Sequence, residues 1–85
     1  MDLSEWRARI DEVDEELVDL INRRLEYAVE IGRIKRAEGL EVRDPQRERD
    51  LLQRLREYNQ GPLGDSALVD IFTRIIAEAR DLEQQ

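Results

Sequence analysis

Two cations share one face of a helix that the apolar pattern predicts. Leu17 and Leu20 continue a spacing of three and four residues that next reaches Arg24, where the pattern favours an apolar side chain. Lys35 follows eleven residues later, and steps of 100° bring it to within about 20° of Arg24 around the helix. Buried cations are costly unless they are paired, so two inward cations predict a cavity for an anionic ligand. The alternative is that both stems lie along apolar surface with their charged heads in water.

Carboxylates also occupy apolar positions on two further predicted helices. Glu48 precedes Leu51 and Leu55 by three and seven residues, so it lies on their side of its helix. An inward carboxylate there can pair with either of the two cations or accept a hydrogen bond from a ligand hydroxyl. Glu83 follows Ala79 by four residues and continues a second buried stripe. Because Glu83 is near the end of the chain, fraying into solvent is the alternative to an inward position.

Three more charged residues are candidates for the same site. Asp44 lies one turn before the inward carboxylate of its helix, although N-capping is the simpler role for it. Arg47 belongs to a charged run over residues 43–50 that ordinarily forms a solvated face. Arg7 precedes Arg24 by 17 residues, which is roughly 25 Å along a helix. Both cannot hold one small ligand from the same chain, so a functional Arg7 must act across a dimer interface.

The composition restricts the chemistry further. The 85 residues include no cysteine and no histidine, which excludes disulfides, thiol nucleophiles, the usual zinc and haem ligands and a Ser-His-Asp triad. The formal net charge of −7 argues against nucleic acid as a partner, although local cations can still bind a small anion. Apolar runs do not exceed three residues and the first residues are acidic. We therefore expect no membrane span, no secretory signal and a soluble, cytoplasmic protein.

Three helices should position these residues within a single all-α domain over residues 1–85. The predicted elements are a helix over 4–38, a loop over 39–43, a helix from Asp44-Pro45 to about Asn59, a turn over 60–64, and a helix capped by Asp65 or Ser66. The first helix is on the order of 50 Å long, longer than a compact domain of this size is wide. A second copy of the chain should therefore cover its apolar stripe.

With this order of elements the chain resembles the AroQ class of chorismate mutases over nearly its whole length. The matching segments are Trp6-Arg7-Ala8-Arg9-Ile10 with Val13-Asp14 and Leu17; Asn22-Arg23-Arg24, Ala28-Val29-Glu30-Ile31-Gly32 and Lys35; and Val42-Arg43-Asp44-Pro45-Gln46-Arg47-Glu48-Arg49. Each segment alone is weak evidence for this family, but their order and spacing together are specific to it. The resemblance implies an intertwined homodimer of three-helix chains with two equivalent sites that converts chorismate to prephenate without a cofactor.

The resemblance also implies roles for the cations. Arg24 and Arg7 of the partner subunit hold the two substrate carboxylates, and Arg47 supports the carboxylate end of the site. Lys35 donates to the ether oxygen and to one carboxylate. Together with Glu83, Arg24 and Lys35 are the residues expected to act in catalysis.

For the acids, the resemblance implies contacts with the rest of the substrate. Glu48 accepts a hydrogen bond from the substrate hydroxyl, and Asp44 contacts that hydroxyl through its backbone. Glu83 stands where many members of the class have a glutamine that donates to the ether oxygen, and a carboxyl can donate only when it is protonated. Gln84 takes this role instead if the register shifts by one residue.

Other functions remain open at the level of sequence. The segment around Gly61-Pro62-Leu63 and the last helix also resemble the mutase-type domain fused to DAHP synthase, where the domain serves as a sensor of prephenate or chorismate. Isochorismate pyruvate-lyase is a further alternative within the same fold. A helical dimerisation module without a ligand is the simplest one.

Overall fold

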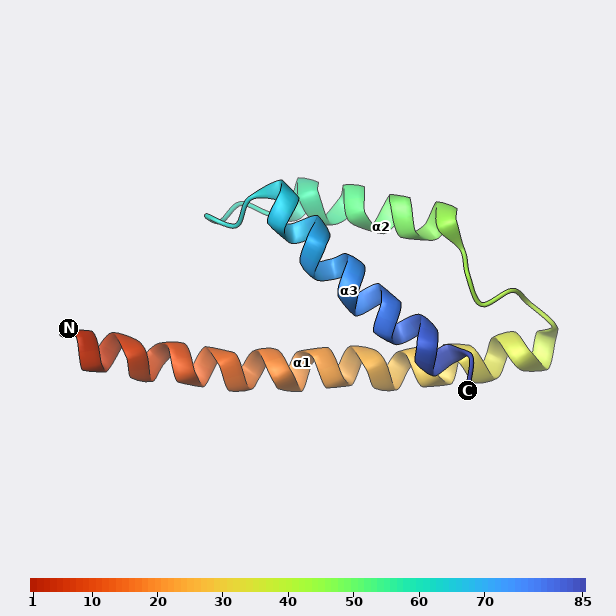
Figure 1. Ribbon diagram of the computed structural model, residues 1–85, viewed down its shortest axis with the longest axis horizontal. Coiled ribbons are helices and arrows are strands. Elements are labelled where there is room, and N and C mark those ends of the chain that lie inside the picture. Colours follow the sequence, from red (N-terminus) through yellow and green to blue (C-terminus); the bar gives the residue numbers. More distant parts are fainter.

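Three helices in the predicted order make up the chain, and the computed structural model describes residues 1–85 (Figure 1). The helices are α1 at Leu3–Glu38, α2 at Pro45–Tyr58 and α3 at Asp65–Glu83. The prediction of an all-α chain with one long and two shorter helices is confirmed. None of the helices is both long and apolar enough to cross a membrane.

Both ends of α1 follow from local chemistry. The carboxylate of Asp2 accepts a hydrogen bond from the Glu5 backbone N–H at 2.8 Å, so the helix begins at Leu3. At the other end Gly39 adopts φ 69° and its N–H donates to the carbonyl of Arg36. A residue without a Cβ enters this left-handed region at little cost and satisfies carbonyls that the helix leaves open.

The start of α3 differs from the prediction. Gly64, and neither Asp65 nor Ser66, occupies the N-cap position, and no side chain caps the helix. The first helical hydrogen bond runs from the Leu68 N–H to the Gly64 carbonyl at 2.9 Å. Asp65 lies instead within the first turn, where its negative charge is stabilised by the positive end of the helix dipole.

The three helices form an open arrangement rather than a closed bundle. In Figure 1, α3 runs diagonally from α2 to the C-terminal half of α1, while the N-terminal half of α1 projects away from both. α3 packs against each of the other helices, and α1 and α2 do not pack directly on one another. The radius of gyration is 16.0 Å, compared with about 12 Å for a compact domain of this length.

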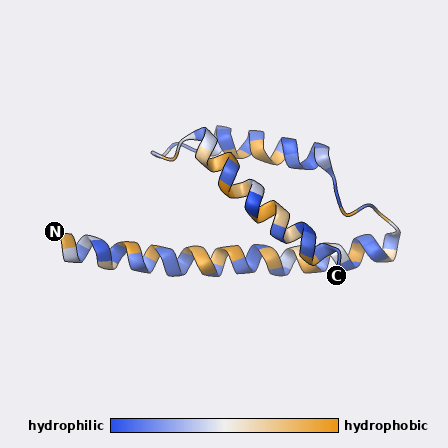
Figure 2. Cartoon of the chain, viewed as in Figure 1, coloured by the Kyte–Doolittle hydropathy of each residue, from blue (hydrophilic) through white to orange (hydrophobic).

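Little apolar surface is buried within one chain. The buried hydrophobic residues are Ala28, Leu51, Leu68 and Ala79. Five apolar residues at helical spacing, which we call the N-terminal stripe, are each exposed by 49% to 58%: Trp6, Ile10, Val13, Leu17 and Leu20. Figure 2 shows apolar residues recurring along α1 beyond the region that α3 covers. The N-terminal stripe is thus an apolar face that a single chain leaves in water.

Gly32 is a point of very close approach between α1 and α3. A Cβ built on Gly32 would lie 2.7 Å from the Cα of Glu83 and 2.8 Å from its carbonyl oxygen. The same carbonyl accepts a hydrogen bond from Nη1 of Arg36 at 2.7 Å. Only a glycine lets the backbone of α3 reach this position, so Gly32 determines where the last turn of α3 meets α1.

We predict that Gly32→Ala destabilises the fold. In an exposed helix the same change would stabilise by about 0.5–1 kcal/mol, but here the methyl group meets backbone atoms that cannot move aside. We expect the free energy of unfolding to fall by about 1–2 kcal/mol, measured by chemical denaturation. Gly61→Ala, whose nearest neighbouring atom would be 3.9 Å away, is the control and should change stability little. A stabilised Gly32→Ala variant would contradict the close approach.

Candidate functional site

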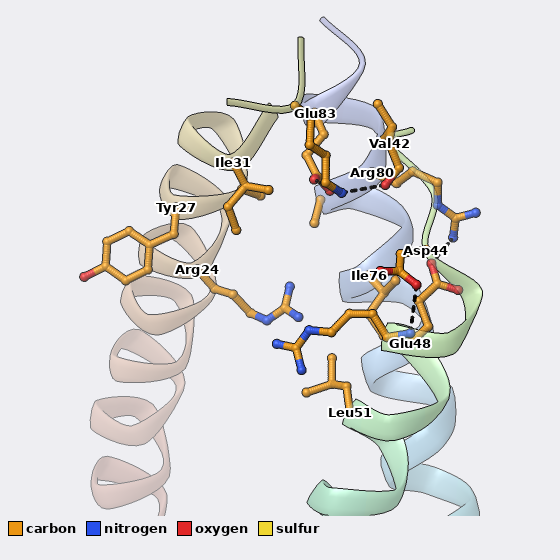
Figure 3. A pocket seen from close by; sticks show the side chains of 14 residues that line it. Arg24, Tyr27, Ile31, Val42, Asp44, Glu48, Leu51, Ile76, Arg80 and Glu83 are labelled. Atoms are coloured by element: carbon orange, nitrogen blue, oxygen red, sulfur yellow. Dashed lines mark hydrogen bonds and ion pairs between the residues drawn. The ribbon is translucent and has the colours of Figure 1, made fainter. Parts of the chain in front are cut away.

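A cavity of about 490 Å³ opens between the three helices and the segment that joins α1 to α2 (Figure 3). Its lining residues are Arg24, Tyr27, Ala28, Ile31, Lys35, Val42, Asp44, Arg47, Glu48, Leu51, Ile76, Ala79, Arg80 and Glu83. Six of the seven residues predicted for the site are in this set, and Arg7 is not. The charges that interrupt the apolar stripes therefore face a common space.

Lys35 lies at the end of the cavity where α1 and α3 meet. Its Nζ is 2.9 Å from Oε1 of Glu83 and donates to the carbonyl oxygen of Val42 at 2.6 Å. The two charged side chains are only 20% and 13% exposed. Glu83 is therefore held inside the site, and the alternative that it frays into solvent is wrong. Gln84 is exposed and does not line the cavity.

Arg24 reaches into the middle of the cavity from α1 (Figure 3). Burial lowers the pKa of its guanidinium, the nearby charge of Arg47 lowers it further, and Glu83 raises it. The Arg24 side chain is thus half-buried, and its head group is partly desolvated. Neither Arg24 nor the side chain of Arg47 has an ion pair or hydrogen bond within the chain. Two adjacent unpaired guanidinium groups have the chemistry to bind carboxylate oxygens.

Glu48 faces Arg80, a cation that is not among the residues predicted for the site. Its Oε1 lies 3.6 Å from Nη2 of Arg80 on α3, so of the two alternatives considered for Glu48, pairing with Arg24 or Lys35 does not occur within the chain. Figure 3 shows Arg80 and Glu48 on the side of the cavity away from α1. The spacing did contain a signal for Arg80, because it follows Ile76 by four residues and so shares the cavity face of α3.

Asp44 combines the two roles considered for it. Its carboxylate accepts a hydrogen bond from the Arg47 backbone N–H at 3.0 Å, and Pro45 occupies the first helical position. The predicted N-cap is confirmed. Asp44 also lines the cavity, so the start of α2 forms part of the wall.

Arg7 lies in a separate part of the molecule. It borders a shallow depression at the start of α1 with Asp2, Leu3, Ser4, Ala8 and Asp11. No residue of this depression lines the main cavity. Within one chain Arg7 therefore does not contribute to the site, as its distance along the helix from Arg24 predicts.

The cavity is locally cationic in an acidic protein. It holds four cations, Arg24, Lys35, Arg47 and Arg80, and three carboxylates, Asp44, Glu48 and Glu83, against a formal charge of −7 for the whole chain. Lys35 and Arg80 have partners within the chain. Arg24 and Arg47 are the cations available to an incoming anion, so the site is suited to a small ligand with carboxylate groups.

The chain is similar to chorismate mutases in both sequence and fold. The family model for chorismate mutase type II matches residues 6–84. A protein named bifunctional chorismate mutase/prephenate dehydratase from Aquifex aeolicus is 35% identical over 88 residues, covering 99% of this chain and 24% of that protein. One of the same name from Escherichia coli K12 is 38% identical, covering 93% and 20%. The chain thus spans between a fifth and a quarter of the length of these relatives.

A solved structure gives the same result for the fold. Chorismate mutase (Form II) from Thermus thermophilus superposes with a TM-score of 0.94 at 32% sequence identity. The match covers 98% of this chain and 94% of that chain. The three-helix arrangement described above is therefore that of a solved chorismate mutase chain.

We predict that Arg24→Met stabilises the fold. The lowered pKa of Arg24 means that the folded chain binds this proton less tightly than the unfolded chain. Below that pKa the charge carries the full cost of burial and of repulsion by Arg47, and the cost disappears only at very high pH. Methionine keeps an apolar stem without the charge, so the melting temperature at neutral pH should rise by up to a few degrees. Arg23→Met, at an exposed neighbouring position, should leave it unchanged. A larger loss of stability for Arg24→Met than for Arg23→Met would contradict the cost of the charge.

Proposed function

The chain belongs to the chorismate mutase type II family, and on this premise we propose that it catalyses the rearrangement of chorismate to prephenate. The observation that carries the proposal is the cavity in which two unpaired arginines, a lysine and carboxylates from two helices converge. A unimolecular rearrangement of this kind needs no nucleophile, which agrees with a site built from Arg, Lys, Asp and Glu. Prephenate is a precursor of phenylalanine and tyrosine, so we place the activity in aromatic amino acid biosynthesis.

The reaction breaks an ether C–O bond and forms a C–C bond within one molecule. The enolpyruvyl side chain must fold over the ring, and a site that holds both carboxylates restricts the substrate to that geometry. Arg24 and Arg47 are unpaired and line the cavity, and Arg24 is partly withdrawn from water, which supports binding of a substrate carboxylate between them. Negative charge grows on the ether oxygen as the bond breaks, so a cation placed there stabilises the transition state.

Lys35 is the cation that we propose for the ether oxygen. It is held between Glu83 and the Val42 carbonyl, so its ammonium group is already oriented before a ligand enters. Three N–H donors allow it to keep one contact with the protein while it donates to the substrate. Glu83 lies beside this ammonium group and would share this role only as the protonated acid, in which case a neutral hydrogen bond would replace its ion pair with Lys35. Glu48 and the backbone of Asp44 would then contact the substrate hydroxyl at the other side.

We propose further that two chains form an intertwined dimer in which the N-terminal stripe is buried. The five residues of the stripe are about half exposed in one chain, and burying such residues is the main driving force of association. The dimer would carry Arg7 of the partner subunit to the cavity, where it could bind the second substrate carboxylate. Each site would then contain residues of both chains.

We propose that residues 1–85 act as a chorismate mutase domain in the cytoplasm. The relatives described above are named for prephenate dehydratase as their second activity, so they give no support to an association with DAHP synthase. Two assays on the same protein sample distinguish these functions. Loss of chorismate absorbance separates a mutase from a sensor, and release of pyruvate from added isochorismate identifies an isochorismate pyruvate-lyase.

Loss of chorismate absorbance with Lys35→Ala tests the function directly. Removing the oriented ammonium should lower kcat on the order of 100-fold or more, while circular dichroism shows a folded chain at the assay temperature. Arg33→Ala is the matched control, because Arg33 is exposed and pairs only with Glu30. It should retain full activity. If Lys35→Ala is largely unfolded at the assay temperature, so that the unfolded fraction accounts for the lost activity, the catalytic role is contradicted.

Mixed dimers test whether Arg7 acts in the site of the partner subunit. Arg7→Ala and Lys35→Ala chains should each have little activity alone, because every site lacks one residue. Co-refolded in equal amounts, half of the dimers contain one intact site, so about a quarter of the wild-type activity should return. Each variant refolded by itself is the control. An absence of recovery would mean that Arg7 does not act across a dimer interface.

A further inference from the structure

We propose that Arg80 is a positioning residue that holds the Glu48 carboxylate ready for a substrate hydroxyl, and that this pair makes the site selective for substrates with a free ring hydroxyl. The inference rests on the proposed function, since it concerns the same cavity. It adds a residue on α3 that neither the apolar pattern nor the family resemblance assigned to the site.

Glu48 depends on Arg80 for its charge compensation. The Glu48 side chain is 24% exposed, and Arg80 is its one ion-pair partner in the chain. At 3.6 Å between Nη2 and Oε1 the two groups attract each other but are farther apart than a hydrogen bond of about 2.7–3.2 Å. The carboxylate therefore keeps both oxygens available as acceptors, which a ligand hydroxyl requires.

Arg80 is a poor structural bridge in this geometry. Its Nε is buried and has no hydrogen-bond partner within the chain. An unsatisfied buried donor lowers the stability of the fold. Arg74 on the same helix provides the contrast, since it binds the Glu78 carboxylate at 2.7 Å on the exposed surface. A bridge selected for stability would use the guanidinium fork in two short hydrogen bonds. The longer Arg80–Glu48 distance suits a carboxylate that must also accept a hydrogen bond from a ligand hydroxyl. Contacts of this kind often shorten when the ligand binds.

Arg80 also keeps Glu48 away from the anion-binding cations. Arg24, Arg47 and Lys35 line the same cavity, and a carboxylate without its own counter-charge would pair with one of them. Such a pair would occupy a position that a substrate carboxylate needs. By holding Glu48 on the side of α3, Arg80 separates the hydroxyl end of the site from its carboxylate end.

The experiment compares Arg80→Met on two substrates, chorismate and an analogue that lacks the ring hydroxyl. We expect kcat/KM for chorismate to fall about tenfold. For the analogue we expect a distinctly smaller fall, because it has no hydroxyl for Glu48 and loses only the cation with which the released Glu48 pairs. Arg74→Met is the matched control and should leave both values unchanged. Equal losses on the two substrates, or no loss on chorismate, would overturn the inference. A wild-type chain that does not convert chorismate would instead overturn the proposed function.

A second pair of variants removes the ambiguity of a folding defect. The loss in Arg80→Met should disappear when Glu48→Gln is already present, because residues that act through one another are not additive. Arg80→Lys keeps a cation and should recover most of kcat/KM. The inference would be overturned if Arg80→Met and Glu48→Gln had additive effects on kcat/KM for chorismate. It would also be overturned if Arg80→Lys and Arg80→Met lost equally much of kcat/KM, whatever their melting temperatures.

Discussion

The crossing of α3 over α1 at Gly32 is the contact on which the site depends. α1 and α2 do not pack on each other, so their separation is set by α3, which packs on both, and by the segment over 39–44 that joins them. Where its last turn meets Gly32, Arg36 binds the Glu83 carbonyl and Lys35 binds the Glu83 carboxylate. These contacts close one end of the cavity and leave the remainder open between the helices. A backbone approach that only glycine permits thus places Glu83 where it binds Lys35, the residue proposed to act on the substrate.

Electrostatic compensation within the cavity is incomplete. Lys35 and Arg80 each have a carboxylate partner, whereas Arg24 and Arg47 have none. Burial and the nearby charge of Arg47 lower the pKa of Arg24, as expected where a partly buried cation lacks a counter-charge. An anionic ligand would provide the missing counter-charge. The incomplete compensation therefore favours ligand binding.

Local patterns predicted the helices and one side of the site, and they failed where distant segments meet. Arg24 and Lys35 follow from helical spacing on α1, because both lie within one regular element. The pairing of Glu48 with Arg80 could not be predicted, since it depends on the angle between α2 and α3. The contact of Gly32 with Glu83 joins residues that are 51 positions apart in the sequence. Helical spacing relates only residues within one helix, so it cannot predict this contact. Spacing indicates which face a charge occupies, but not which opposite charge it meets.

The length of α1 links the fold to the proposed dimer. Its C-terminal half carries Arg24 and Lys35, and its N-terminal half carries Arg7 and the half-exposed N-terminal stripe. A chain of 85 residues has too little interior to bury a helix of 36 residues by itself. Covering the stripe with a second copy would bring Arg7 of the partner subunit to a cavity that already has two unpaired arginines. The dimer formed through this apolar surface would then place a further cation, Arg7 of the partner subunit, in the site.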